Sequence, residues 1–131
     1  KIIEKKILSF KPTNLISHYS QDTNNDHRIV ARSVEMATRP VNGIELSVFS
    51  FEVLSSSEWN LNQPFVANAF IQLSEKDVQN KIEVLKIYDG EVREFPHSRS
   101  SEGVKSLSRY RGIQVGMSFA EAFLVNRLNV S

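Results

Sequence analysis

The sequence predicts an α/β fold in which a mostly parallel sheet is covered by helices. Short β-rich segments alternate with amphipathic helical segments, and the connections between successive strands are long rather than tight hairpin turns. In addition, 40% of the 131 residues are hydrophobic and 24% are charged, which is the balance of a globular chain. We interpret residues 1–131 as a segment of a single domain.

Proline and capping residues indicate where the predicted elements begin and end. Pro12 follows the first helix and Pro40 stops the second. We expect Asn25 or Asp26 to cap the second helix, and Ser74 to open a capping box at the third. The predicted elements, in chain order, are a helix over 1–9, a strand over 13–19, a helix over 26–40, strands over 44–53 and 65–73, helices over 74–92 and 101–117, and a strand over 118–128.

Hydrophobic periodicity predicts which side chains of the first half form the core. In the first strand we expect Leu15 and Ile16 at the buried centre. In the second helix the spacing of Val30, Val34 and Ala37 predicts the buried stripe, because residues three and four apart lie on one face of a helix.

Composition argues against several functional classes. The formal net charge is +1, so there is no strong electrostatic case for nucleic acid or membrane binding. The absence of cysteine rules out disulfides and thiolate chemistry and mildly favours a cytoplasmic location. No apolar run approaches the length of a membrane span. Because the chain begins without methionine and apparently inside a helix, we expect it to be a fragment.

The sharpest candidate site lies in a polar loop, SHYSQDTNNDHRIV at residues 17–30. The loop follows a predicted strand and precedes a helix, which is where ligands sit in α/β sheets. His27, in the first helical turn, could bind a divalent metal such as zinc as a neutral imidazole, and Asp26 could orient a histidine or handle a proton. The alternative interpretation is a helix cap followed by a surface histidine. A zinc site needs three or four ligands, so the others must come from distant positions or from outside this chain.

Two further polar features are candidates for substrate contacts. His97 and Arg99, in the loop PHSRS, could contact an anionic or hydroxylated substrate, although a solvated loop explains them equally well. Arg111 lies in an otherwise apolar helical stripe, where it either reaches solvent or pairs with a specific partner, as in a structural salt bridge.

Five segments together resemble the carboxyl-terminal part of the LmbE-like (PIG-L) deacetylase family. In chain order they are HYSQDTNNDHRIV, ATRP, FEVLSSSEW, PHSRSSEGVKSLSRYRGIQVG and AEAF. The resemblance implies a three-layer Rossmann-like fold with a mostly parallel sheet, of which this chain is the second half. It also implies zinc-dependent removal of an acetyl group from an N-acetylglucosamine-type sugar conjugate.

The resemblance assigns roles to residues of the polar loop. The family's later metal motif, often His-Pro-Asp-His, matches Asn24-Asn25-Asp26-His27, so His27 matches the third zinc ligand and Asp26 the aspartate before it. Asn24 stands where many relatives have a catalytic histidine and could still donate a hydrogen bond. The resemblance makes His97, Arg99 and Arg111 candidates for supporting the metal ligands or for binding the substrate.

The family's first motif, of the Ala-His-Pro-Asp-Asp-Glu type, does not occur in these residues. That motif supplies the other two zinc ligands and the general base, so we expect the chain alone to have little activity. The expected partners are an N-acetyl amino-sugar and an amino-terminal segment of the same protein, and a homo-oligomer is compatible with the sequence. The alternatives are a sugar-binding or structural relative without catalysis and, with less support, a metal nuclease.

Overall fold

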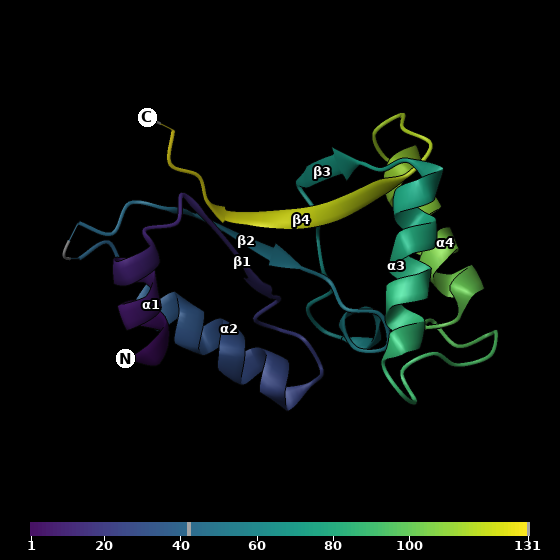
Figure 1. Cartoon of the computed structure of the whole chain (residues 1–131), viewed down its shortest axis with the longest axis horizontal. Helices are drawn as coiled ribbons and strands as arrows, with labels where there is room; N and C mark the ends of the chain where they lie inside the picture. The colour runs from purple at the N-terminus through teal and green to yellow at the C-terminus, as the bar shows by residue number, and fades with distance from the viewer. Residues whose placement is uncertain (42, 131) are drawn as a thin grey trace. The chain divides into compact units, whose positions relative to one another are not determined.

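The computed structural model describes residues 1–41 and 43–130. Helices and strands alternate along the chain as the sequence predicts (Figure 1). The elements are α1 (Ile2–Phe10), β1 (Asn14–His18), α2 (Asn25–Ala37), β2 (Ser47–Phe51), the 3-10 turn η1 (Ser57–Trp59), β3 (Ala69–Gln72), α3 (Glu75–Ile87), α4 (Ser101–Ile113) and β4 (Ala120–Arg127). The predicted α/β fold class is therefore confirmed.

The four strands found in the described part of the chain form one mixed sheet in the order β1-β2-β4-β3. Strand β1 runs parallel to β2, with His18 opposite Phe51 at their carboxyl ends. Strand β4 runs antiparallel to β2, and its register shifts between Val48 and Phe49. The parallel pair matters most for function, because it places the loops that follow β1 and β2 at the same edge of the sheet.

The chain divides into two compact units. The first comprises residues 1–68 and 123–131, and therefore holds α1, β1, α2, β2 and most of β4. The second comprises residues 69–122, and holds β3, α3, α4 and the start of β4.

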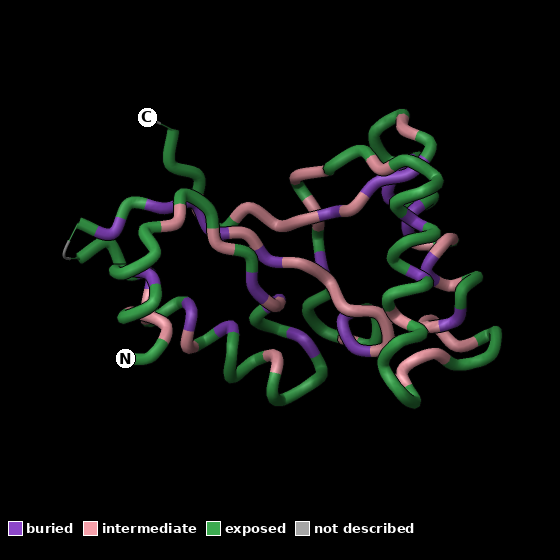
Figure 2. The backbone as a smooth tube through the Cα atoms, in the orientation of Figure 1, coloured by how far each residue is buried: buried purple, intermediate pink, exposed green. Residues whose placement is uncertain are grey.

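The core of the first unit gathers side chains from α1, α2, β2 and the segment before β2. Its buried members are Ile7, Val34, Ile44, Leu46 and Val48. Buried positions recur along one side of α2 (Figure 2). Burial of these aliphatic side chains removes apolar surface from water, which is the main force holding the unit together.

Two predicted core positions are wrong. Ile16 is 55% exposed, because side chains alternate between the two faces of a strand, and Leu15 and Ser17 occupy the covered face of β1. Val30 is 39% exposed, whereas Ala31 is buried in its place. Helix α2 is rotated so that Ala31 and Val34, three residues apart, face the sheet together, and Val30 falls outside this stripe.

Helix caps follow the sequence closely, with one correction. Ser74 and Asp77 form the capping box that opens α3, and Ser100 caps α4 through a hydrogen bond from the Gly103 amide. The cap of α2, however, is Asn24 rather than Asn25 or Asp26, because its side chain accepts the Asp26 amide.

In the second unit, α3 packs on α4. The carboxyl end of α4 also lies very close to the segment that enters β4. A Cβ added at Gly112 would lie 2.5 Å from the Met117 carbonyl oxygen and 2.9 Å from the Phe119 Cα. Only glycine fits there without displacing this backbone.

Candidate functional site

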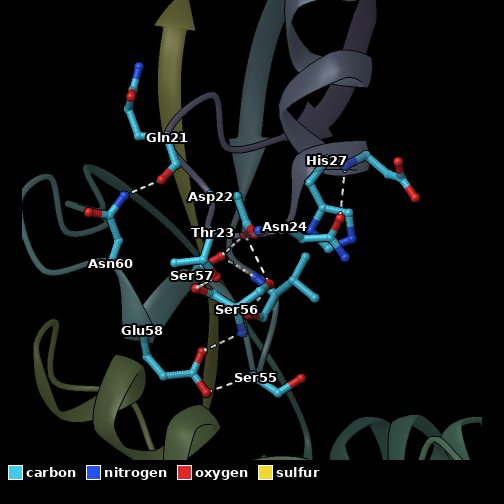
Figure 3. Close-up of polar contacts among 12 residues, drawn as sticks. Gln21, Asp22, Thr23, Asn24, His27, Ser55, Ser56, Ser57, Glu58 and Asn60 are labelled. Carbon is cyan, nitrogen blue, oxygen red and sulfur yellow. Dashed lines mark hydrogen bonds and ion pairs between the residues drawn. The ribbon is translucent and has the colours of Figure 1, made fainter.

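The candidate site is built around Asp22, in the loop between β1 and α2. The side chain has no solvent exposure. One carboxylate oxygen, Oδ2, accepts hydrogen bonds from the Ser57 hydroxyl at 2.6 Å and the Ser56 hydroxyl at 3.1 Å. The other, Oδ1, accepts the Asn24 amide at 2.8 Å (Figure 3). A buried carboxylate with this many donors is held in one orientation.

The same contacts determine the charge of Asp22. Burial by itself raises the pKa of a carboxyl group, because it disfavours the charged form. Hydrogen bonds from Ser57, the Asn24 amide and Ser56, followed by the nearby His27, outweigh burial and hold the Asp22 pKa below its ordinary value. Asp22 is therefore an anion at neutral pH, buried at the foot of α2.

His27 extends from the first turn of α2 toward this anion. Its Nδ1 lies 3.2 Å from Asp22 Oδ1, and its side chain is 19% exposed. The two atoms are at ion-pair distance without being aligned as a linear hydrogen bond. A carboxylate beside Nδ1 favours the proton on that nitrogen and leaves Nε2 with its lone pair. This is the arrangement in which a histidine serves as a metal ligand.

A second imidazole packs on the first. The rings of His18, at the end of β1, and His27 stack with centroids 4.3 Å apart and planes inclined by 22°. The Phe51 ring lies 4.8 Å from His18 on the neighbouring strand. Burial, and then the proximity of His27, lower the pKa of His18 against the opposing effect of Asp22. The His18 ring is therefore neutral at pH 7.

The two residues matched to catalytic positions lie beside this cluster. Asn24 uses its side-chain oxygen to cap α2, accepting the Asp26 amide at 2.9 Å. Asp26 is exposed in the first turn of the helix. A carboxylate there is favoured by the positive end of the helix dipole.

The loop that follows β2 supplies the other half of the cluster. Glu58 accepts the amides of Ser55 at 2.6 Å and Ser56 at 3.2 Å, which folds the chain back on itself. Thr23 then donates its hydroxyl to the Ser56 carbonyl at 2.7 Å, and Asn60 donates its side-chain amide to the Gln21 carbonyl (Figure 3). The loops after β1 and β2 are thus joined by several hydrogen bonds, although more than 30 residues separate them.

The remaining candidates belong to the second unit, and each has structural contacts there. The ring nitrogen Nδ1 of His97 accepts the Arg99 amide at 3.1 Å. The Arg99 guanidinium pairs with Glu91. Arg111 is buried in α4 and donates to the Gln114 side-chain oxygen at 2.9 Å. The structure therefore brings Asn24, Asp26 and His27 together in the first unit. The other three candidates, His97, Arg99 and Arg111, belong to the second unit.

The described residues do not complete a metal site. Within residues 1–41 and 43–130, no group of three or more His, Cys, Asp or Glu side chains is arranged to hold an ion. Among the helices that the structure describes, none is long and apolar enough to cross a membrane.

Comparison with solved structures identifies the wider fold. The chain is similar to the conserved protein TT1542 from Thermus thermophilus. The two structures superpose with a TM-score of 0.68 at 19% sequence identity, and the match covers 99% of this chain and 58% of TT1542. The chain thus spans little more than half the length of TT1542. At this identity the likeness establishes the fold alone.

Sequence comparison adds nothing further. No family model and no curated protein sequence matches the chain. The resemblance to TT1542 is therefore one of architecture, carried by the arrangement of strands and helices.

Sequence reasoning missed three residues of the cluster: Asp22, Ser56 and Ser57. The polar loop contains both Asp22 and Asp26, and nothing in the spacing of the sequence indicates that Asp22 is the one that is buried. The one available signal was the run of three serines in the loop after the second strand, since the loops after parallel strands meet at one edge of a sheet.

Proposed function

We propose that this chain is the carboxyl-terminal segment of a zinc-dependent hydrolase that removes an acetyl group from an N-acetylglucosamine-type sugar conjugate. The observation that carries the proposal is His27 at the start of α2, with Nδ1 held 3.2 Å from the fully buried Asp22. The resemblance of the motif around His27 to the LmbE-like family supplies the reaction. The TT1542 match, which leaves 42% of that chain uncovered, agrees with a segment of a longer protein.

The residues present fit one part of a metal site. His27 would hold zinc through Nε2, because the Asp22 anion occupies the Nδ1 side. Two further ligands and the general base would come from residues outside this chain. When bound, zinc supplies Lewis acidity, which polarises the amide carbonyl and lowers the pKa of water.

Other residues of the chain would position the substrate. Asp26 is an exposed carboxylate next to His27, suited to holding a proton or a sugar hydroxyl. Asn24 retains a side-chain NH2 group that can donate to an oxyanion while its oxygen caps the helix. His97, Arg99 and Arg111 remain candidates for contacts with the sugar or its conjugated group.

The test uses the complete protein encoded with this chain. Zinc content and release of free amine from N-acetylglucosamine conjugates are measured for the wild type and for His27→Ala. His97→Ala serves as a matched control for the loss of an imidazole. We expect His27→Ala to lose both zinc and activity, and His97→Ala to retain zinc. A wild-type protein that binds no zinc, or a His27→Ala variant with full zinc content, would contradict the proposal.

A second candidate is a sugar-binding or structural relative without catalysis. The observation in its favour is Asn24, where relatives have a catalytic histidine and where the side chain here serves the helix cap. This candidate predicts full zinc content without turnover. Binding of N-acetylglucosamine conjugates by calorimetry, together with zero amine release, would favour it over the deacetylase.

A further inference from the structure

The first unit contains a cavity that the proposed function does not use. Its volume is about 720 Å³, and residues of β1, α2, β2 and β4 line it. His18 is among the lining residues, but Asp22, Asn24, Asp26 and His27 are not. The cavity therefore adjoins the proposed zinc site through His18, but it is not lined by the residues proposed to act there.

The lining is strongly basic. Arg28, Arg32, Arg39 and Arg127 all contribute to it, and the carboxylate among the lining residues is that of Glu35. Glu35 pairs with Arg32 at 2.6 Å. One acid and four guanidinium groups leave a net charge of +3 in a chain whose total is +1.

The other three arginines contact only neutral acceptors among the residues that the structure describes. The Arg28 guanidinium donates to the Asn25 side chain at 3.3 Å. Arg39 donates to the Met36 carbonyl at 3.1 Å. Arg127 donates to backbone carbonyls of the first unit at 2.7 and 3.2 Å. These contacts orient the guanidinium groups and leave their positive charge uncompensated.

The rest of the lining mixes apolar side chains with polar ones, the latter from Ser17, His18, Ser20, Gln21, Thr38, Ser50 and Asn126. Ala31, Val34 and Val48 supply aliphatic surface. Ser17 also lines the cavity and is 6% exposed, and its Oγ has no hydrogen-bond partner within residues 1–41 and 43–130. Buried polar groups are normally satisfied, so an open hydroxyl in a cavity wall indicates a place for a ligand or water.

We infer that this cavity binds an organic phosphate, that is, a small molecule with an apolar body and several negative charges. The volume is that of small-molecule sites, which favours a small ligand over a protein segment. Guanidinium groups bind phosphate oxygens in pairs, and the aliphatic wall suits a ring or chain. The inference stands on the cavity alone and does not depend on the deacetylase proposal.

The test measures binding of ATP, without magnesium, to the complete protein by isothermal titration calorimetry at low salt. We expect the double variant Arg28→Gln/Arg39→Gln to bind ATP at least tenfold more weakly than the wild type. Arg93→Gln, which removes one exposed arginine of the second unit, should bind as the wild type does. Glu35→Gln should bind severalfold more tightly, because it removes the negative charge from the lining. Circular dichroism checks that the variants are folded.

Three results would overturn the inference. The first is a wild-type protein that binds no ATP, or a double variant that binds as tightly as Arg93→Gln. The second is loss of ATP binding in His27→Ala, which would place the phosphates at the proposed zinc site. The third is tighter binding of hexaglutamate than of ATP, which would identify an acidic peptide as the occupant.

Discussion

The Asp22 carboxylate accepts a 2.6 Å hydrogen bond from the hydroxyl of Ser57, which lies 35 residues further along the chain. Asp22 follows β1 and Ser57 follows β2, and these two strands are parallel neighbours. The bond therefore joins the two loops at the edge of the sheet where α/β proteins bind their ligands. The bond also holds the Asp22 carboxylate in place next to His27.

Replacement of Asp22 is expected to weaken folding strongly. Asp22→Ala leaves the buried Ser57 hydroxyl and the partly buried Asn24 amide without their acceptor, and it leaves the Ser56 hydroxyl with the Val53 carbonyl alone. We expect the free energy of unfolding to fall by about 3 kcal/mol, measured by urea denaturation. Asp26→Ala, at an exposed position in the first turn of α2, should cost less than about 1 kcal/mol. Equal losses in the two variants would contradict the network.

The Asp22 charge is also expected to matter for metal binding in the complete protein, if His27 is a zinc ligand. Asp22→Asn keeps the size of the side chain but removes the anion beside His27 Nδ1. Loss of such a partner typically lowers metal affinity about 10- to 100-fold. Competition with a zinc-binding dye measures the effect, and Asp89→Asn, an exposed residue of the second unit, provides the control. Unchanged affinity in Asp22→Asn would show that the carboxylate does not support a metal ligand.

Asn24 is expected to stabilise α2 as its amino-terminal cap, independently of any role in catalysis. Asn24→Ala removes the acceptor for the Asp26 amide and should lower stability by about 1 kcal/mol. Asn24→Asp retains an acceptor oxygen and should remain close to the wild type. Thermal unfolding of the two variants distinguishes them. If both variants melt at the wild-type temperature, the cap contributes nothing to stability.

The capping box of α3 gives a pH-dependent prediction. The Ser74 side chain and backbone donate hydrogen bonds to Asp77, and these bonds lower the Asp77 pKa. A carboxyl with a lowered pKa in the folded state stabilises the fold above its unfolded pKa of about 3.9 and loses this effect as the pH falls through the folded value. The melting temperature of the wild type should therefore exceed that of Asp77→Asn at pH 7, and the difference should shrink below about pH 4. A difference that stays constant down to about pH 2 would argue against a role for the charge.

Close packing at Gly112 predicts a steric effect. Gly112→Ala would bring Cβ to 2.5 Å from the Met117 carbonyl oxygen, and backbone must move to make room. We expect a loss of about 1–3 kcal/mol in urea denaturation. Gly90→Ala has no neighbour within 4 Å of the added Cβ but a φ of +71°, so it should cost about 1 kcal/mol from backbone strain alone. If the Gly112→Ala variant were as stable as the Gly90→Ala variant, the close approach of Gly112 to the Met117 carbonyl would be contradicted.

The sequence by itself determined the order and type of the helices and strands and where the helices begin, but α2, α3 and α4 end three to five residues before the predicted positions. These features are local: Pro12 and Pro40 mark helix ends, and the Ser74–Asp77 capping box involves residues three positions apart. The position of His27 at the start of a helix after a strand could be predicted for the same reason.

Only the tertiary structure decided which side chains meet. The pairing of Asp22 with Ser57, the stacking of His18 on His27 and the basic cavity beside α2 depend on strand register and on the rotation of a helix about its axis. Rotation also exposed Val30 and buried Ala31. Hydrophobic periodicity defines a face only to within about one residue, or about 100° of helix rotation, and it carries no information on contacts between loops far apart in the chain. The partners of a buried carboxylate are fixed by the packing of the whole sheet edge, which no short stretch of sequence contains.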